Sequence, residues 1–297
     1  MKILPSDTST KLDGHEWIPK SLDTFIKELD HLVSSWRKLD HYLLFRGHRD
    51  HRWLLDCTFV RNIKQNIFGI DPLLKVISTY RSSLEYQRLL GSLFLLKFET
   101  ITPPFPDLMK LDKVDPYFEW MRRIQQYPKE DVSPLGGTFL VDWTQDEKVA
   151  MFFASEHSDI SSTDGAVWIV DFTATGKVLH RDLTVEEILS KYKEAFMADN
   201  PLGIPLVFYP NYQIASERAK NQDVVYIAQM DMRLDLCETW EKFERENNTQ
   251  VIIKIRLPHP AKAECRRWLE SKGITKKYIY PDIEFPTTEG KGGGLGA

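Results

Sequence analysis

Hydrophobic and polar residues follow patterns along the chain that predict both helices and strands. After Ser21, apolar residues recur at every third or fourth position up to Trp36, as on one face of an amphipathic helix, and the Ser21 hydroxyl can cap its first turn. The apolar run 43–45 then predicts a short buried strand. We expect this strand to end in a turn at Arg46 and Gly47.

Later segments repeat this mixture of elements. Asp71 followed by Pro72 is typical of a helix start, and this helix could extend toward residue 98, before the prolines of 101–106 break regular structure. Further strands are predicted at 138–141, 166–170, 204–208, 224–227 and 251–255, and further helices near 142–154 (capped by Asp142 or Thr144), 184–187 and 261–272. Because strands and helices are mixed without strict alternation, the pattern favours an α+β fold over a doubly wound sheet.

Composition narrows the cellular setting. Of the 297 residues, 42% are hydrophobic and 28% are charged, which is typical of a soluble globular protein with a substantial core. The net charge of −4 lacks the basic surplus of a protein that holds nucleic acid electrostatically, but it leaves room for a local basic patch. The three cysteines are scattered, the N-terminus has no apolar signal-peptide core, and the apolar run 93–96 is too short to span a membrane. We therefore expect a cytoplasmic protein with reduced thiols.

Polar residues gather after the first predicted strand, in the segment 45–53. The guanidinium of Arg46, beside Gly47 where a ligand could approach the backbone, can present a planar fork of donors to a phosphate, a carboxylate or a nucleotide amide. The same arginine could instead pair with a buried acid that holds the strand end. His48 and His51 are weak evidence for a metal site without further ligands, and no metal is expected.

Two later segments carry polar residues beside predicted strands. In the first, Asp142 and Thr144 could bond a ribose, position Arg46, or simply cap the following helix, and Trp143 could stack on a base or belong to the core. In the second, residues 216–223 precede a strand, which is typical of a pocket rim or of a loop held by a salt bridge. The sequence contains no Gly-rich phosphate loop, nucleophile elbow or HExxH motif.

Four blocks of the sequence resemble the FRG domain, a family of bacteria and phages named for a Phe/Tyr-Arg-Gly motif. The blocks are Phe45-Arg46-Gly47 with Trp53-Leu54-Leu55 and Arg61, then Leu140-Val141-Asp142-Trp143-Thr144 with 150–154, then Arg218 to Gln222, and finally Pro258, Gly273-Ile274-Thr275 and Tyr280-Pro281-Asp282. The family usually has a HYG-x-P-T segment before the second block, whereas this chain has Gln126-Tyr127-Pro128 without the histidine. The resemblance implies a single domain over residues 20–285, with a helical N-terminal part and an insertion within about 62–135, and a flexible tail at 286–297.

A more distant resemblance connects the chain to mono-ADP-ribosyltransferases of the Arg-Ser-Glu type. Arg46-Gly47 is similar to the Arg-Gly at the end of their first strand, and 139–154 is similar to their F-x-S-T-S strand and A-x-x-F-A helix, with Asp142-Trp143-Thr144 in place of Ser-Thr-Ser. Asn221-Gln222-Asp223 stands where their Glu-x-Glu element would be. This resemblance implies an ADP-ribosyltransferase-like α+β fold, with a split mixed/antiparallel sheet, flanking helices and a helical N-terminal part.

The same resemblance implies that NAD is the substrate and assigns roles to particular residues. The expected NAD-binding residues are Arg46, Gly47, Asp142, Trp143, Thr144 and Arg218, and the expected catalytic residues are Arg46, Gln222 and Asp223. In such a site the arginine holds the phosphates or a ribose of NAD. A carboxylate stabilises the positive charge that develops on the nicotinamide ribose as nicotinamide leaves. Gln222 is neutral and cannot supply that charge, so Asp223 or Glu217 is the candidate from sequence.

These features predict a bacterial or phage toxin, or an anti-phage defence effector, that transfers ADP-ribose to a protein or nucleic-acid target. An antitoxin or defence-system partner is a further expectation, and membrane association is not expected. Two alternatives stay open. One is a non-catalytic module that senses a nucleotide or a phage component through the same pocket. The other is a nucleic-acid-processing enzyme that uses the basic residues Arg46, Arg49, Arg52 and Arg61.

Overall fold

Helices and strands alternate irregularly along the chain, so the prediction of an α+β fold is confirmed. The computed structural model describes residues 2–75, 135–156, 162–175, 217–229 and 234–282, together with 89, 92–93, 121–122, 124–125, 179–180 and 207–208. In this part of the chain, no helix combines the length and the apolar character that crossing a membrane requires.

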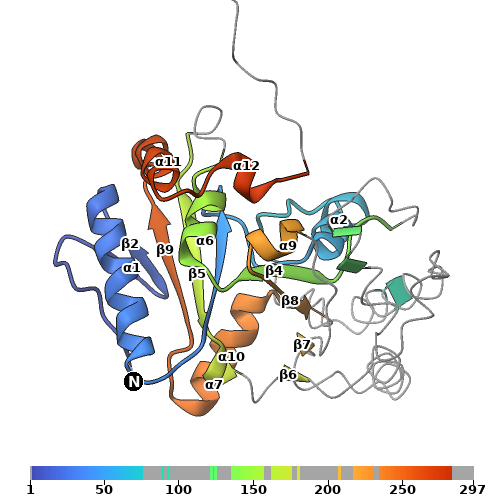
Figure 1. The fold of residues 1–297 in the computed structure, drawn as a ribbon. Coiled ribbons are helices and arrows are strands. Elements are labelled where there is room, and N and C mark those ends of the chain that lie inside the picture. The colour runs from blue at the N-terminus through green and yellow to red at the C-terminus, as the bar shows by residue number, and fades with distance from the viewer. Residues whose placement is uncertain are drawn as a thin grey trace, which may run out of the picture.

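The described elements, shown in Figure 1, are short strands and helices of mostly one to four turns. The strands are β1 (Lys11–Asp13), β2 (Glu16–Ile18), β3 (Leu43–His48), β4 (Leu140–Thr144), β5 (Gly165–Asp171), β6 (Leu179–His180), β7 (Val207–Phe208), β8 (Val224–Gln229) and β9 (Ile252–Leu257). The helices are α1 (Leu22–Arg37), α2 (Thr58–Asn66), α6 (Glu147–Ala154), α7 (Phe172–Thr175), α9 (Glu217–Asn221), α10 (Leu236–Asn247), α11 (Lys262–Ser271) and α12 (Lys276–Ile279), with a 3-10 turn at His259–Ala261.

These strands form one mixed sheet, in the order β1-β2-β9-β5-β3-β4-β8-β7-β6. Neighbouring strands are antiparallel except for β2 with β9 and β6 with β7. Every residue of the central strand β5 is buried, because helices cover both faces of the sheet at this point.

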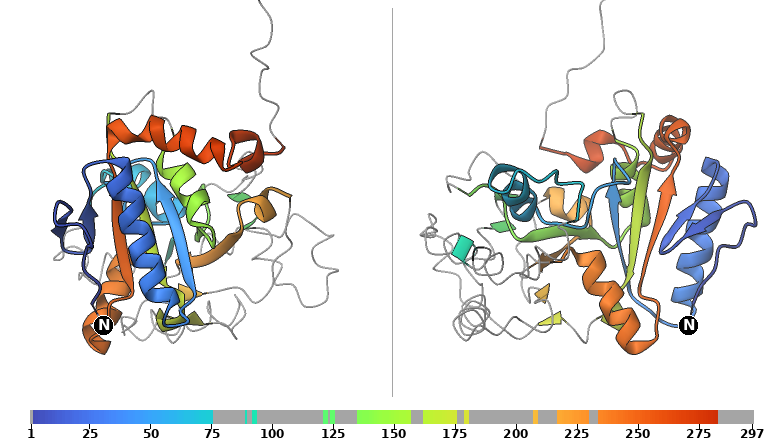
Figure 2. Two further views of the ribbon diagram at one scale, coloured as in Figure 1. Left: turned by 60° about the vertical axis from the view of Figure 1, so that its left-hand side comes forward. Right: turned by 180° about the vertical axis from the view of Figure 1, so that it is seen from behind.

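The two faces of β3 contact different helices. Its side chains alternate, so Leu43 and Phe45 pack in the cluster of α1, α6 and α11, while Leu44 packs in the cluster of α2 and α10. Figures 1 and 2 show α1 on one side of β5 and β9, and α10 on the other. The same alternation places Arg46 and His48 on the face of Leu44.

The sheet splits between β3 and β4. β3 pairs with β5 along its whole length, from Leu43 to His48, but it pairs with β4 only through Phe45 and Thr144. β4 in turn pairs with β8 along its whole length. Figure 1 shows β4 and β8 running across the direction of β5 and β9. Beyond the single pair, the two strands diverge and leave an opening at the end of β3.

Helix α6 lies very close to the sheet at two glycines. A Cβ added to Gly47 would lie 1.9 Å from the carbonyl oxygen of Ala150, and one added to Gly165 would lie 2.1 Å from that of Ala154. Only glycine allows a helix backbone to approach so near. We expected a glycine at position 47 to let a ligand approach the strand. The structure shows that a glycine is needed there mainly because the α6 backbone packs against it. The backbone of Gly47 also borders the pocket described below.

The N-terminal residues belong to the same sheet. β2 pairs in parallel with β9, Trp17 on β2 is fully buried, and the amide of Ile3 donates to Oε1 of Gln250 at 2.7 Å. Strand pairing and burial therefore extend upstream of residue 20, where the resemblance implied the start of the domain. The N-terminal part is also not purely helical. Most of the predicted insertion at 62–135 and the whole tail at 286–297 lie outside the described residues.

Several predicted elements are confirmed. Ser21 caps α1, since its hydroxyl accepts a hydrogen bond from the Thr24 amide at 3.2 Å. The strands predicted at 166–170, 224–227 and 251–255 correspond to β5, β8 and β9, and the helix at 261–272 corresponds to α11. The strand predicted at 138–141 corresponds to β4, although it begins later and continues through Thr144.

Other predicted elements need correction. β3 does not stop at Arg46 but continues through His48. Helix α6 is capped by neither Asp142 nor Thr144: the Asp146 carboxylate accepts from the Lys148 amide at 2.7 Å. Helices α2 and α10 were not predicted. The helices expected at 71–98 and 184–187, and most of the strand at 204–208, lie outside the described residues.

Candidate functional site

A pocket with a volume of about 340 Å³ opens at the split between β3 and β4. Four separate segments line it: the end of β3 with its following loop, the end of β4, the end of α6, and the α9–β8 turn. The lining residues are Phe45, Arg46, Gly47, His48, Arg49, Trp53, Asp142, Trp143, Thr144, Phe153, Glu156, Arg218, Gln222 and Val224. Of the predicted site residues, all except Asp223 therefore border one pocket, whose volume suits a small ligand.

The guanidinium of Arg46 spans the opening between the two strands. Nη1 donates to the main-chain carbonyl oxygen of Asp142, and Nε donates to Nε2 of His48 at 2.9 Å. Burial lowers the pKa of Arg46 to about 10, the nearby Asp142 carboxylate opposes this effect, and the group stays charged at neutral pH. Within the described residues Nη2 makes no hydrogen bond, so this donor is available to a ligand.

His48 is the buried partner of Arg46, and we did not predict it as a site residue. Because Nε2 accepts a hydrogen bond from Nε of Arg46, the ring is neutral and carries its own proton on Nδ1. Burial first, and then the Arg46 charge, lower the pKa of His48 well below its usual value. Trp53 and Trp168 meet the ring at steep angles, with centroid distances of 5.8 and 6.5 Å. Its spacing from Arg46 was the available signal, since alternate residues of a strand share a face.

In the part of the chain that the structure describes, three guanidinium groups line the pocket without a carboxylate partner. Among the described residues, no carboxylate lies within 4.0 Å of the guanidinium nitrogens of Arg46, Arg49 or Arg218. Arg49 instead lies over the Trp53 ring at 4.9 Å, and Arg218 lies over the Tyr280 ring at 4.8 Å. Stacking orders these side chains and leaves their in-plane N–H groups free to donate. Donors of this kind are suited to phosphate oxygens.

The loop after β3 brings Arg49 to the pocket and is held at two residues near its start. The His51 amide donates to the Asp164 carbonyl at 2.9 Å, and Lys262 Nζ donates to the Arg49 carbonyl at 2.6 Å. Burial, followed by the charge of Arg256, lowers the pKa of His51. His48 and His51 therefore lie in different surroundings and do not form a common site.

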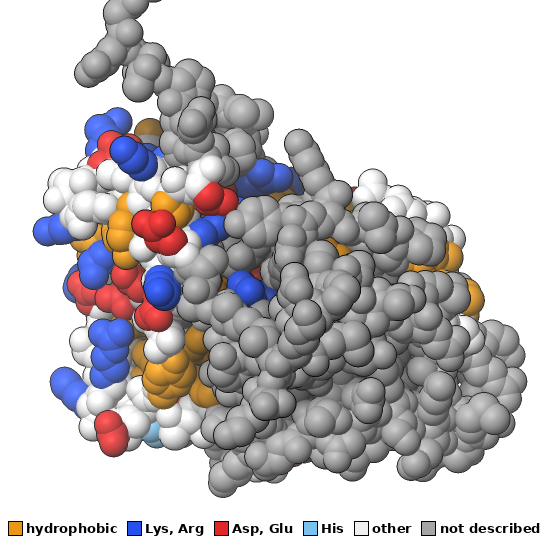
Figure 3. All heavy atoms as spheres, turned by 45° about the vertical axis from the view of Figure 1, so that its right-hand side comes forward, with side chains coloured by type: hydrophobic (Ala, Val, Ile, Leu, Met, Phe, Trp, Pro, Cys, Tyr) orange, Lys and Arg blue, Asp and Glu red, His pale blue; other side chains and the backbone are white. Residues whose placement is uncertain are grey.

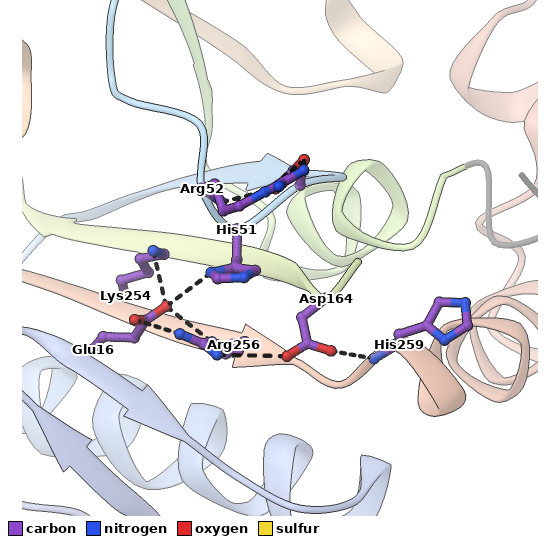
Figure 4. Close-up of polar contacts among 8 residues, drawn as sticks. Glu16, His51, Arg52, Asp164, Lys254, Arg256 and His259 are labelled. Carbon is purple, nitrogen blue, oxygen red and sulfur yellow. Dashed lines mark hydrogen bonds and ion pairs between the residues drawn. The ribbon is translucent and has the colours of Figure 1, made fainter. Parts of the chain in front are cut away.

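A network of ion pairs, drawn in Figure 4, anchors this loop to the sheet. Glu16 on β2 pairs with Lys254 and with Arg256, each at 2.8 Å, and lies 3.8 Å from Nδ1 of His51. Arg256 also lies 3.7 Å from Asp164. Burial raises the pKa of Glu16, but the hydrogen bonds from Arg256 and Lys254 outweigh it, so the net shift is downward. The network thus joins β2, β9 and the loop that carries Arg49.

Asp142 and Trp143 border the pocket, but their polar atoms are enclosed. Oδ2 of Asp142 accepts from the side-chain Nε2 of Gln125 at 3.1 Å, whereas Oδ1 is buried and has no hydrogen-bond partner among the described residues. Trp143 is 1% exposed and packs in the core cluster of β4 and β8. Of the two roles considered for Trp143, the structure supports the core residue. Trp53 and Phe153 are the partly exposed rings on the pocket wall.

Thr144 joins the end of β4 to the α9–β8 turn. Its hydroxyl donates to the Gln222 carbonyl at 2.6 Å and accepts from the Asp146 amide at 3.1 Å. The Gln145 amide donates to the Asp223 carbonyl at 3.1 Å, which adds a second link to the same turn. Since the donor of the hydroxyl is already used, Thr144 shapes the pocket rather than bonding a ligand.

Gln222 lines the pocket, whereas Asp223 is not among the lining residues. The side-chain Nε2 of Gln222 donates to the Ile279 carbonyl at 3.0 Å, which ties the turn to α12. Asp223 has a left-handed φ of 44°, and its exposed carboxylate accepts from Gln145 Nε2 at 3.2 Å. Aspartate tolerates this backbone conformation better than most residues, which accounts for its place after α9. The carboxylate expected at Asp223 is therefore not on the pocket wall.

Glu156, just after α6, is a carboxylate on the pocket wall that we did not predict. Oε1 accepts from the Tyr280 hydroxyl at 2.9 Å. Burial, and then the negative charge of Glu156, raise the pKa of Tyr280, so the phenol keeps its proton and donates. The Tyr280 ring packs against Phe152 and Phe153 at 6.2 and 6.4 Å. In the sequence, the only indication that Glu156 belongs to the site was its position just past the A-x-x-F-A pattern of α6.

Comparisons of the chain with models of known protein families, with curated proteins and with solved structures found no match. Membership of the FRG family and likeness to ADP-ribosyltransferases therefore stay predictions from the motifs. The structure adds a spatial relationship between those motifs. Residues from the first three blocks line one pocket, and the hydroxyl of Tyr280, in the fourth block, donates a hydrogen bond to Glu156 on the wall of that pocket.

Proposed function

We propose that the chain is an FRG-domain protein whose pocket binds NAD and that it transfers ADP-ribose to a protein or nucleic-acid target, as a bacterial or phage toxin or anti-phage effector. The observation that carries this proposal is the convergence of Arg46, Arg49 and Arg218 on one pocket, with no carboxylate partner among the described residues. NAD joins its two nucleosides through a pyrophosphate, and guanidinium groups bind such oxygens well. The partly exposed Trp53 and Phe153 rings offer apolar surface for a base or for nicotinamide.

The split of the sheet gives further support for an ADP-ribosyltransferase-like arrangement. The resemblance implies a split sheet with the arginine on its first strand, and here the pocket lies where β3 and β4 share only the pair of Phe45 and Thr144. In the proposed complex, Arg46 Nη2 and Arg218 hold the phosphates. Thr144 keeps the α9–β8 turn against β4, so that the two halves of the pocket stay together.

A non-catalytic nucleotide sensor is the second candidate. It is favoured by Gln222, which is neutral and whose amide already donates to the Ile279 carbonyl. A sensor would bind the nucleotide through the same arginines without turnover. Ligand at 100 times its dissociation constant would then stabilise the fold by about 2.7 kcal/mol.

A nucleic-acid-processing enzyme has less support. Two of the basic residues considered for this role are already engaged, since Arg52 pairs with Asp50 at 2.6 Å and Arg61 donates to the Asp56 carbonyl. Figure 3 shows acidic and basic side chains side by side on the described part of one face. A steep loss of RNA or DNA affinity with added salt would favour this candidate over the proposal.

The test uses purified protein with labelled NAD, alone and with cell extract. We expect NAD to raise the melting temperature, nicotinamide to be released, and label to be transferred to a macromolecule. Arg46→Ala should lose all three effects, because it removes the donor that spans the split. Arg37→Ala is the matched control, since Arg37 is half exposed, pairs with Glu147 and lies outside the pocket.

The outcomes separate the candidates. Stabilisation by NAD with no release of nicotinamide and no transfer of label would identify a sensor instead of a transferase. If NAD does not stabilise the wild type, and Arg46→Ala behaves like Arg37→Ala, the proposal of an NAD pocket is wrong.

A further inference from the structure

Transfer of ADP-ribose requires a negative charge beside the ribose that loses nicotinamide. The residues expected from sequence do not provide it. Gln222 is neutral, and Asp223 is exposed, bonded to Gln145 and absent from the pocket wall. Glu217 is exposed and is also absent from the pocket wall. Among the described residues that line the pocket, the carboxylates are those of Asp142 and Glu156.

Asp142 is poorly placed to act on a ligand. Its Oδ1 has no exposed surface, its Oδ2 is bonded to Gln125, and its charge acts on the adjacent Arg46 guanidinium. Glu156 differs in exposure and in hydrogen bonding, although its charge also acts on a guanidinium, that of Arg266. The side chain of Glu156 is partly exposed on the pocket wall, and among the described residues only Oε1 has a hydrogen-bond partner, the Tyr280 hydroxyl.

The fold also holds Glu156 at a defined position. Helix α6 cannot shift away from β3 and β5 without losing its packing on Gly47 and Gly165. Tyr280 is fixed on its other side, because Arg218 stacks on its ring and the preceding residue Ile279 accepts from Gln222. Glu156 therefore follows a short helix, α6, and its position is held by the Tyr280 side chain just after α12, on which Arg218 of α9 stacks.

We infer that Glu156 is the catalytic carboxylate of this pocket and that Tyr280 is its positioning residue, an inference that rests on the proposed NAD reaction. Gln222 then acts indirectly, by holding the segment that carries Tyr280. This assignment places the negative charge on the wall formed by α6, and not on the α9–β8 turn where the resemblance implies it.

The chemical step can be written in full. The bond between the anomeric carbon of the ribose and the nicotinamide ring nitrogen breaks, and both bonding electrons move to that nitrogen, so neutral nicotinamide leaves. The positive charge passes to the anomeric carbon and the ribose ring oxygen, where the Glu156 carboxylate stabilises it. A nucleophile of the target, or water, forms the new bond with a lone pair and releases its proton to solvent.

The decisive variant is Glu156→Gln, because its amide oxygen can still accept from Tyr280 while the charge is gone. We expect NAD affinity to change by less than about 3-fold and the rate of nicotinamide release to fall by about 100-fold or more, as for loss of a charge that acts in the transition state. Glu147→Gln makes the same chemical change at the first residue of α6, outside the pocket, and should match the wild type.

Tyr280→Phe tests the positioning role, since it removes only the hydroxyl and keeps the stacked ring. We expect kcat to fall about 10-fold with KM changed less than about 2-fold. The double variant Glu156→Gln/Tyr280→Phe should be no slower than Glu156→Gln alone, because the hydroxyl acts through the carboxylate. Additive losses would mean that Tyr280 acts on its own.

The other outcomes are equally distinct. If Glu156→Gln releases nicotinamide at the wild-type rate, this inference is wrong and the transferase proposal stands. If the variant only weakens NAD binding, Glu156 is a binding group and not a catalytic one. If the wild type binds NAD and releases no nicotinamide, the transferase proposal itself fails, and the assigned role of Glu156 fails with it.

Discussion

Nε of Arg46 donates a hydrogen bond to Nε2 of His48 at 2.9 Å, and this contact fixes the protonation of both side chains. The guanidinium needs an acceptor, and the imidazole nitrogen is one only while the ring is neutral. Protonation of His48 would place two buried cations in contact. Burial and the Arg46 charge accordingly lower the pKa of His48 well below its usual value. The arrangement that presents Arg46 to the pocket thus depends on a neutral histidine.

The first prediction follows from this pair and concerns acid stability. Unfolded His48 takes up a proton below about pH 6.5, whereas folded His48 does not, so the free energy of unfolding should fall as the pH drops. His48→Gln keeps an acceptor for Arg46 but cannot titrate. Urea denaturation should therefore show a smaller loss of stability between about pH 7 and pH 5 in the variant than in the wild type. An equal loss in both would mean that His48 titrates normally in the folded protein.

The second prediction concerns the contact between Gly47 and α6. A methyl group at Gly47 would overlap the Ala150 carbonyl, which is backbone and cannot turn aside. We expect Gly47→Ala to lose more than about 3 kcal/mol of unfolding free energy or to fail to fold. Gly14 is the control: its φ is +59° but nothing lies within 4 Å of an added Cβ, so Gly14→Ala should cost only about 1 kcal/mol of strain. Similar costs for both variants, measured by denaturation, would contradict the close approach of α6.

The third prediction concerns the buried ion pair of Lys64 and Asp56. Both side chains are nearly inaccessible, and Oδ1 of Asp56 also accepts from Gln229 at 3.0 Å. Lys64→Met should cost about 3–5 kcal/mol, because it leaves a buried carboxylate without its cation. Adding Asp56→Asn should recover part of that loss, since the remaining group is then neutral. A double-mutant cycle by urea denaturation measures the coupling, and two independent, additive losses would contradict it.

The fourth prediction concerns stability at alkaline pH and the protonation of His15. Hydrogen bonds to Glu241 and Glu244 raise the pKa of His15 to about 9. A raised pKa means that the folded protein holds a proton which the unfolded chain releases above about pH 6.5, so this contribution to stability is complete below that pH and is lost as the pH rises through the folded value. His15→Gln should therefore flatten the fall in the free energy of unfolding over that pH range. The comparison by urea denaturation at matched ionic strength checks it.

Local patterns predicted much of the fold, because they act within a few residues. The apolar spacing after Ser21 and the serine cap were enough to locate α1. Helix α10 was missed although Asp235 and Glu238 form a capping box before Trp240, a signal readable in the sequence. β2 could not be found in this way, since it is three residues long and is defined by pairing with β9, more than two hundred residues away.

The same difference between local and long-range signals explains which residues of the candidate site were predicted. Arg46 and Thr144 were predicted because each stands in a motif at a strand end, and both line the pocket. Glu156 was missed because its position depends on two long-range contacts. One is the approach of α6 to Gly47, and the other is the hydrogen bond from Tyr280, a residue near the far end of the chain. Asp223 was selected for its charge, while its left-handed backbone conformation and its exposed side chain depend on how α9 ends.

The fifth prediction concerns the link between Thr144 and Gln222. Thr144→Val keeps the shape of the buried side chain but removes the donor to the Gln222 carbonyl and the acceptor for the Asp146 amide. We expect a loss of about 1–3 kcal/mol in unfolding free energy, because buried polar groups are left without partners. Thr144→Ser retains the hydroxyl and should stay close to the wild type. Because this hydroxyl ties the α9–β8 turn to β4, Thr144→Val should also weaken binding of NAD, whereas a purely local cap would leave the affinity measured by titration calorimetry unchanged.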